Sequence, residues 1–345
     1  MHSCTYPKNG PTIERAEKNY IPDDVVFKTK PQIALDLIDR ARANGIEVEA
    51  WTADEVYGRD GAFLDGLEQR RQAFVVEIPA NARAWLAKPK VLRKPPKNGT
   101  RRSKKYPRIA RRDAKASKVS NLAKYSPGFT EQTAQKYKIS DNSRGAEVWE
   151  IRRHPCWRKT KQSGPVSRQC TLIVARNVLT DEVKYFLSNR VPGRNRWTVR
   201  RILRVAFGRW PVEGCFREAK EELGLDHFEC RGWRCIHRHL YTTILSQLFC
   251  AQTRQRLSPS EDVCSGELLT MEQVRRAADV VIKTIGLRRR DQDRMFAEEL
   301  ARQRYYARRN AAAAKSHRKT RRKRLRKIGI DPEKIKAVEV SHPNE

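Results

Sequence analysis

The segment Ala73–Ile78, with the sequence AFVVEI, limits the possible folds more than any other part of the chain. Three consecutive large apolar residues followed by Pro79 are typical of a short strand that is buried on both faces. Apolar residues at helical spacing precede this segment over 31–43 and 63–69, and a strand-like segment at 46–53 lies between them. Helix, strand, helix and strand in so few residues predict an α/β unit with parallel pairing.

A basic stretch and then a β-rich stretch follow. From Lys88 to Lys124 the chain is dense in Lys and Arg, is interrupted by Pro and has almost no large apolar residues. We therefore expect a linker here, or an arm that becomes ordered on DNA. Residues 171–187, TLIVARNVLTDEVKYFL, predict a β-hairpin with its turn at 177–181, and 147–152 alternates like a further strand.

The second half of the chain combines helical spacing with positive charge. Helical spacing runs from 197 to about 257 and again from 271 to 327. The chain has 73 Lys and Arg against 40 Asp and Glu, a net charge of +33 that indicates a polyanionic partner. Nucleic acid is the commonest polyanion, and an anionic membrane surface is the weaker alternative. Lys315–Lys327 holds nine Lys or Arg in thirteen positions, so we expect it to contact phosphates without reading sequence.

Several classes of protein are excluded. No apolar run approaches the roughly 20 residues that a membrane span needs. The N-terminal sequence MHSCTYPKNG lacks the apolar centre of a signal peptide. The eight Cys residues include no CxxC pair and do not form a disulfide scaffold. We expect reduced thiols in a cytoplasmic protein, with no membrane partner and no small-molecule substrate.

The first segment that could carry chemistry is WTADEVYG, residues 51–58. Asp54 follows the predicted strand and precedes a Gly turn, which is where open α/β sheets bind their ligands. Its carboxylate would project from the edge of the sheet toward a cleft. The alternative is that Asp54 only caps the turn that follows. The spacing alone leaves both interpretations open.

The second segment is RWPVEGCFREAK, residues 209–220. Pro211 suits the first turn of a helix and Gly224 its end. Glu213 and Lys220 are seven residues apart and lie on nearly one helical face, where they could present an acid and a base to a cleft. The alternative is a first-turn Glu favoured by the helix dipole and a surface Lys. An apolar stripe that we expect to pack into the core lies beside them: Val212, Phe216, Ala219 and Leu223.

Together and in this order, the two segments resemble the DDE transposases of bacterial insertion sequences. The closest likeness is to the subgroup with a β-rich insertion between its second and third acids and the signature Y-x2-R-x3-E-x6-K. Arg209, Glu213 and Lys220 match the R, E and K, whereas Ala206, with Phe207 beside it, takes the place of the Tyr. The resemblance covers roughly residues 5 to 255. It implies an RNase H-like catalytic core, interrupted by the insertion and followed by a basic helical tail.

The resemblance also implies roles for these residues. The reaction would be metal-dependent DNA cleavage and strand transfer, in which two divalent cations stabilise the attacking and leaving oxygens. Asp54 and Glu213 would be the second and third carboxylate ligands of Mg²⁺ or Mn²⁺. Arg209 and Lys220 would bind phosphate oxygens or orient the DNA end.

The first catalytic Asp of the family lies on a strand upstream of the region equivalent to residue 1. We therefore expect this chain to lack that Asp and the first β-hairpin of the fold, and to be weakly active or inactive alone. We expect part of the core at 1–84 and a basic linker with the β-rich insertion at 85–192. The third-acid helix and closing helices would occupy 193–257, and a basic helical tail 258–345.

The partners implied by the resemblance are element ends and target DNA, with a homodimer and a nucleoid-associated location in bacterial cytoplasm as further expectations. The alternative function is a non-catalytic nucleic-acid-binding protein or a regulator of transposition. Metal affinity at Asp54 and Glu213 separates the two functions, because only the catalytic one requires it.

Overall fold

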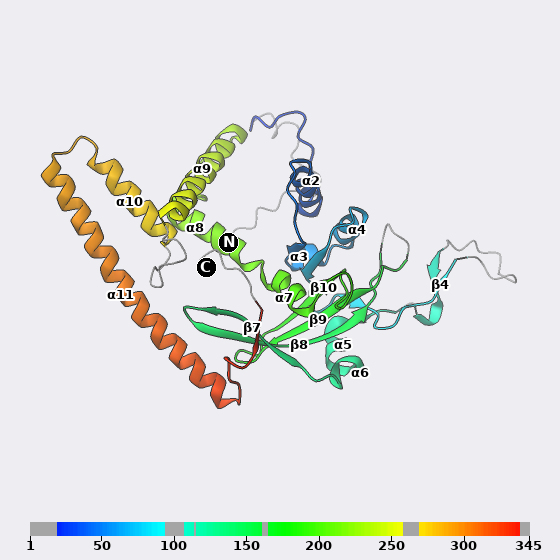
Figure 1. Ribbon diagram of the computed structural model, residues 1–345. Helices are drawn as coiled ribbons and strands as arrows, with labels where there is room; N and C mark the ends of the chain where they lie inside the picture. Colours follow the sequence, from blue (N-terminus) through cyan, green and yellow to red (C-terminus); the bar gives the residue numbers. More distant parts are fainter. Residues whose placement is uncertain (1–18, 94–106, 114, 161–164, 258–268, 339–345) are drawn as a thin grey trace. The chain divides into compact units, whose positions relative to one another are not determined.

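The computed structural model describes residues 19–93, 107–113, 115–160, 165–257 and 269–338 (Figure 1). The chain divides into two compact units. The sheet unit consists of Thr29–Arg209 and Ala314–Ser341, and the helical unit of Met1–Lys28, Trp210–Ala313 and His342–Glu345. No helix among the described residues combines the length and the apolar character that a membrane crossing requires. The four-part division expected from the sequence stays a prediction.

A seven-stranded sheet forms the centre of the sheet unit, in the order β1-β2-β10-β9-β8-β7-β11. The two pairs at its ends, β1 with β2 and β11 with β7, are parallel, and all the others are antiparallel. The predicted α/β class and the predicted parallel pairing are therefore confirmed. The strands are β1 (Trp51–Ala53), β2 (Phe74–Glu77), β7 (Gln135–Asn142), β8 (Gly145–Cys156), β9 (Cys170–Asn177), β10 (Val183–Ser188) and β11 (Lys336–Ala337).

Side chains alternate between the two faces of this sheet, and each face is covered by its own helices. Phe74 and Val76 pack into a cluster with apolar residues of four helices, whereas Val75 packs into a second cluster against one helix. The first face carries α2 (Lys30–Ala43), α4 (Gly61–Gln69), α5 (Val119–Tyr125) and α6 (Pro127–Thr130). The second carries α7 (Val199–Phe207). Predicted helices at 31–43 and 63–69 and the predicted hairpin at 171–187 are confirmed.

One strand prediction was wrong in part, and one strand was not predicted. The expected strand at 46–53 is shorter, because only Trp51–Ala53 pairs with β2. The sequence analysis missed β7, in which Tyr137 and Ile139 are buried and their neighbours are more exposed.

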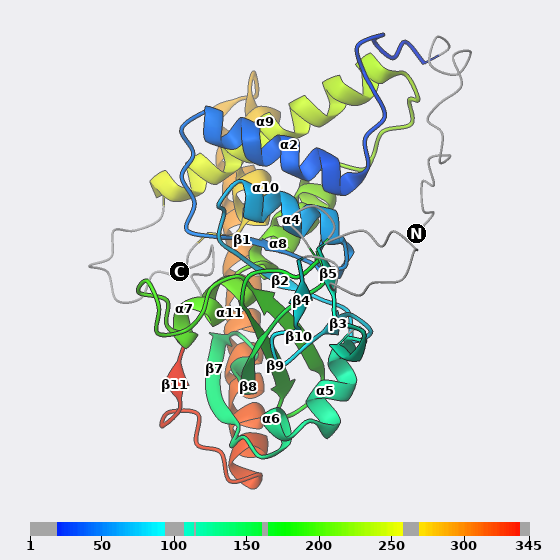
Figure 2. The same cartoon turned by 90° about the vertical axis from the view of Figure 1, so that its right-hand side faces the viewer.

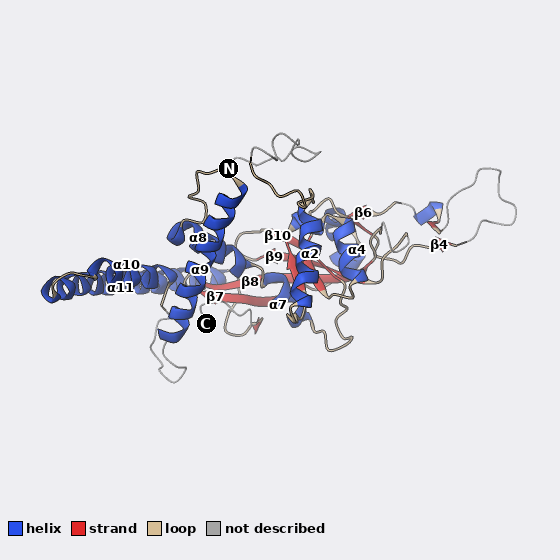
Figure 3. Cartoon of the chain, turned by 90° about the horizontal axis from the view of Figure 1, so that it is seen from above, coloured by secondary structure: helices blue, strands red, loops and turns tan. Residues whose placement is uncertain are grey.

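The predicted linker from Lys88 to Lys124 is structured where the structure describes it; 94–106 and 114 lie outside the described residues. Two short antiparallel pairs and a turn form a ribbon that projects from the sheet unit (Figure 3). Trp85 anchors its base, because its backbone pairs with Trp157 and its Nε1 donates to the Asp113 carbonyl at 2.9 Å. The elements are β3 (Arg83–Ala84), β4 (Val91–Leu92), β5 (Arg108–Ile109), η1 (Arg111–Asp113) and β6 (Ser117–Lys118). At the end of this segment Val119 of α5 is fully buried in the core of the sheet unit, so the linker prediction was wrong there.

The helical unit contains α8 (Trp210–Leu223), α9 (Trp233–Leu257), α10 (Met271–Thr284) and the first part of α11 (Arg289–Lys327). The last turns of α11 belong to the sheet unit and lie against the β7–β8 hairpin (Figure 2). Leu325 is fully buried there with Ala146 and Val148. Gly145 has φ +90°, and a Cβ on it would lie 3.2 Å from the Cα of Arg318, so the helix approaches the hairpin closely.

A buried ion cluster connects α4 to the chain that follows β8. Arg158 Nη1 lies 2.7 Å from Asp65 Oδ1, and Arg158 Nη2 lies 3.0 Å from Glu68 Oε1. The side chain of Asp65 is 0% exposed, so its charge depends on Arg158 for compensation. Removal of one partner from such a cluster leaves a buried charge unpaired.

We expect Arg158→Met to lower the free energy of unfolding by about 3–5 kcal/mol, measured by urea denaturation. The matched control is Arg176→Met, which removes the exposed pair with Asp181 and should cost about 1 kcal/mol or less. Equal losses of unfolding free energy in the two variants would show that the buried cluster stabilises the fold no more than an exposed ion pair does.

Candidate functional site

Asp54 lies at the carboxyl end of β1 and is the N-cap of α3 (Glu55–Gly58). Its Oδ1 accepts hydrogen bonds from the backbone N–H of Val56 at 2.9 Å and of Tyr57 at 3.4 Å. The capping interpretation is therefore confirmed. Its Oδ2 accepts no hydrogen bond from the described part of the chain, so a ligand role remains compatible with the cap.

The turn after Asp54 is fixed by close packing of α3 on β2. Gly58 is buried, and a Cβ at this position would lie 1.9 Å from the carbonyl oxygen of Glu77. Only glycine allows this approach. The ring of Tyr57 packs beside Phe63 with 5.4 Å between centroids. The TADEVYG sequence thus holds the Asp54 carboxylate on a rigid edge of the sheet.

A second carboxylate, which the sequence analysis missed, lies at the same edge. Ala53 pairs with Val76, so Asp54 and Glu77 follow at adjacent positions of the parallel pair. Lys184 Nζ lies 3.8 Å from Glu77 Oε1. Burial raises the pKa of Glu77, while the charges of Lys184 and Arg209 act in the opposite direction. The sequence alone places Glu77 near the end of the predicted strand AFVVEI. Only the strand register shows that it lies beside Asp54.

The third-acid segment forms the predicted helix. Glu213 and Lys220 lie on α8, which ends before Gly224 at φ +68°. Both side chains are exposed, and Lys220 Nζ is 3.9 Å from Asp226 Oδ2. The expected burial of the apolar stripe was wrong for Val212 and Phe216, which are exposed, and is confirmed for Ala219.

The predicted site residues are divided between the two units. Asp54 and Arg209 belong to the sheet unit, and the charge of Arg209 acts on Glu77 at the edge that carries Asp54. Glu213 and Lys220 belong to the helical unit.

Two carboxylates lie at this edge of the sheet. Carboxylate oxygens such as those of Asp54 and Glu77 are the ligands that Mg²⁺ prefers. Among the residues that the structure describes, no group of three or more His, Cys, Asp or Glu side chains could hold a metal ion. The described edge therefore offers hard oxygen ligands without completing a coordination shell.

We expect Asp54→Asn to leave the free energy of unfolding nearly unchanged, because Asn caps a helix as well as Asp does. Asp54→Ala should lower it by about 1 kcal/mol, measured by urea denaturation. Asp60 is the matched control, since it caps α4 through Ala62 and Phe63 and should respond in the same way. A large loss in Asp54→Asn would show that the carboxylate has a structural role beyond the cap.

The raised pKa of Glu77 predicts a pH-dependent stability. The folded chain binds the Glu77 proton more tightly than the unfolded chain does, so the ionised side chain disfavours folding at neutral pH. Glu77→Gln should therefore raise the free energy of unfolding at neutral pH. The gain should decrease as the pH falls through the raised pKa toward the ordinary value of 4.5. Urea denaturation over a pH series measures this, with the exposed Glu182→Gln as control; a loss of stability at neutral pH would contradict it.

One comparison with known proteins is informative. Residues 4–146 match a family model described as DDE superfamily endonuclease. The matched range contains Asp54 and Glu77 and ends before Arg209, Glu213 and Lys220. No curated protein matches the chain. Over this range, the chain is similar to DDE-type transposases and nucleases.

Proposed function

We propose that the chain is a DDE-type transposase of an insertion sequence, which cleaves and transfers DNA strands with the help of divalent cations. The observation that carries the proposal is the position of Asp54. It lies inside the matched segment, at the carboxyl end of a parallel strand and on an edge that Gly58 holds rigid. That is where α/β sheets present carboxylates to ligands.

In this proposal, Asp54 and Glu213 hold Mg²⁺ or Mn²⁺, and Arg209 and Lys220 contact phosphate oxygens. Phosphoryl transfer asks the protein mainly for positioning and for charge stabilisation. The Oδ2 of Asp54 is not used by the cap, so it can serve a cation while Oδ1 holds α3. Arg209 adds positive charge at the same edge.

The sheet topology leaves room for a further carboxylate beside Asp54. β1 is the outermost strand, and β2 is its one partner among the described strands. A further strand could pair along the outer edge of β1 and bring a carboxylate beside Asp54. This arrangement fits the proposal of an RNase H-like core.

The second candidate function is a non-catalytic DNA-binding protein or a regulator of transposition. The incomplete metal shell of the described residues favours it. So does the basic end of α11, which lies against the sheet unit and exposes Lys319, Arg322 and Arg326. A homodimer and a location at the bacterial nucleoid stay predictions.

Mn²⁺ binding, measured by electron paramagnetic resonance, tests the proposal. We expect the wild-type chain to bind Mn²⁺, and Asp54→Asn and Glu213→Gln each to weaken binding about tenfold or more. Asp60→Asn and Glu218→Gln, which change neighbouring acids on α4 and α8, are the controls and should bind like wild type.

Unchanged Mn²⁺ binding in both site variants would contradict the proposal and favour the non-catalytic function. Nicking of supercoiled DNA in the same buffers adds an activity measurement. We expect little nicking by the wild-type chain. Metal-dependent nicking that disappears in Glu213→Gln would support the site and contradict the expected inactivity.

A further inference from the structure

The segment from β10 through α7 is rich in arginine. Residues 189–209 contain seven Arg and no Asp or Glu. This segment lies outside the range matched by the family model, and Arg209 is its one residue with a role in the proposed function. The structure shows which of these arginines interact with other side chains of the sheet unit.

Two of the seven support the fold. Arg190 and Arg201 lie over the ring of the buried Trp197, at 5.8 and 4.7 Å from its centroid. Arg201 also pairs with Glu49, as does Arg204 at 3.3 Å. Glu49 therefore compensates only part of the positive charge of this segment.

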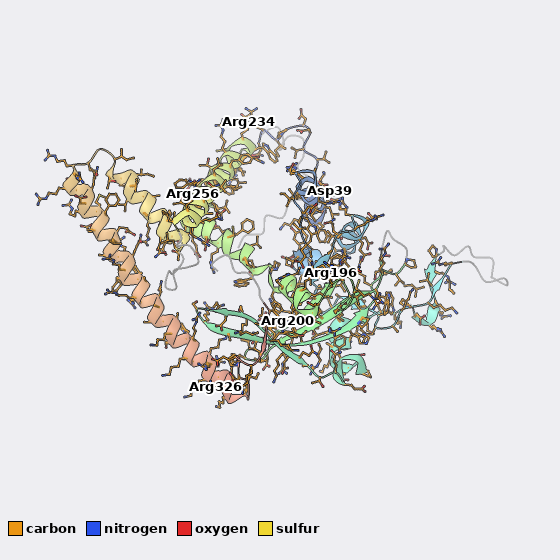
Figure 4. The ribbon with its side chains drawn as sticks, in the orientation of Figure 1. Asp39, Arg196, Arg200, Arg234, Arg256 and Arg326 are labelled. Carbon is orange, nitrogen blue, oxygen red and sulfur yellow. The ribbon has the colours of Figure 1, made fainter. Side chains whose placement is uncertain are left out.

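Arg194, Arg196 and Arg200 have exposed side chains. No carboxylate in the described ranges lies within ion-pair distance of them. Arg204 is also exposed, and it lies one helical turn beyond Arg200 on the same face of α7. We call Arg194, Arg196, Arg200 and Arg204 the arginine track; Figure 4 labels two of them, Arg196 and Arg200.

The loop that begins the track is rigid. Gly193 N–H donates to the Trp197 carbonyl at 2.8 Å, and Trp197 N–H donates to the Arg194 carbonyl at 3.0 Å. Arg201 Nη1 donates to the carbonyl of Arg196 at 3.3 Å. Arg196 has φ +61°, a conformation that is uncommon for Arg and is held here by these contacts. A preorganised loop loses less entropy when its side chains bind a ligand.

The sheet register fixes the course of the track. Ser188, at the end of β10, pairs with Val75 near the start of β2, so the loop lies at the amino ends of the parallel strands. α7 then runs over the second face of the sheet for nine residues, about 13 Å, toward Arg209 and Glu77. The track therefore begins at the amino end of the parallel pair, where Arg204 pairs with Glu49, and the chain continues past it to Arg209 at the end that carries Asp54.

We propose that the arginine track binds the phosphate backbone of duplex DNA and guides it toward the edge that carries Asp54. The guiding role rests on the proposed function, whereas backbone binding does not. The guanidinium group suits this task, because it stays charged and can form two hydrogen bonds with one phosphate. Arg200 and Arg204 are separated by a rise of about 6 Å, and phosphates of one strand follow every 3.4 Å along the duplex, so both can reach one strand. Such contacts position DNA without reading its sequence.

The test is the salt dependence of duplex binding, measured by fluorescence anisotropy without divalent metal. The variant carries Arg194→Gln, Arg196→Gln and Arg200→Gln; Arg204 stays because it pairs with Glu49. At about 50 mM salt, we expect this variant to bind duplex about tenfold or more weakly than the wild type, and the difference should narrow toward about 200 mM salt. The slope of log affinity against log salt should lose about 2.7, which is 0.9 for each of three phosphate contacts.

The matched control removes three positive charges from the helices on the other face of the sheet, by Arg40→Gln, Arg42→Gln and Lys124→Gln. Its affinity should change less than about threefold, with a slope change below about 1. Circular dichroism and urea denaturation confirm that both variants fold. The loop bonds of Arg194 and Arg196 use their backbone carbonyls, which Gln retains.

The proposal is overturned if the wild-type chain does not bind duplex, or if the track variant keeps the wild-type affinity and slope. An equal loss of affinity in the control variant would also overturn it. So would a tenfold preference of the wild-type chain for single-stranded DNA or RNA over duplex. A track effect without Mn²⁺ binding would contradict the proposed catalysis and leave backbone binding supported. Mn²⁺ binding with wild-type DNA affinity in the track variant would support the proposed metal site and contradict backbone binding by the track.

Discussion

Strand β2 is the element on which the sheet unit depends. Phe74, Val75 and Val76 are fully buried, and they divide between the two apolar clusters. β2 also joins two kinds of pairing, because β1 is parallel to it and β10 is antiparallel. The Asn189 side chain extends this connection, since it bonds the backbone of Gln72 and Phe74 at the base of the arginine loop. The edge with Asp54 and the loop with Arg194 are thus attached to opposite ends of one rigid strand.

The parts of the fold that the sequence predicts are those with strong local apolar patterns. Runs of adjacent apolar residues predict the buried strands in AFVVEI and in the hairpin at 171–187. The helix at 31–43 is predicted by the spacing of its apolar residues. The β4–β5 ribbon could not be predicted this way, because it depends on the contacts of Trp85 with Trp157 and Asp113, which are distant in sequence. β7 has too few apolar residues between its Lys and Gln side chains to be distinguished from a loop.

The candidate site was predictable to the level of single segments. The position of Asp54 at a strand end and the helix that carries Glu213 both follow from local sequence and are confirmed. The spacing left open whether Asp54 caps the turn that follows. The observed hydrogen bonds from Val56 and Tyr57 establish that it does. Glu77 becomes a site residue only through its register with Asp54. In the same way, the arginine track becomes visible only when the contacts of Arg190 and Arg201 with Trp197 separate them from the exposed arginines of the segment.

The pairing of β11 with β7 has a consequence for how the chain is made. Lys336 and Ala337 pair with Tyr137 and Lys138, so this part of the outer edge of β7 is covered only after residue 337 has been synthesised. With roughly 200 intervening residues added at about 5–20 per second, that edge stays open for about 10 to 40 s on the ribosome. An open strand edge is a template for pairing with another nascent chain. Lys136 and Lys138 in β7 counteract this, because their charges disfavour the stacking of identical strands.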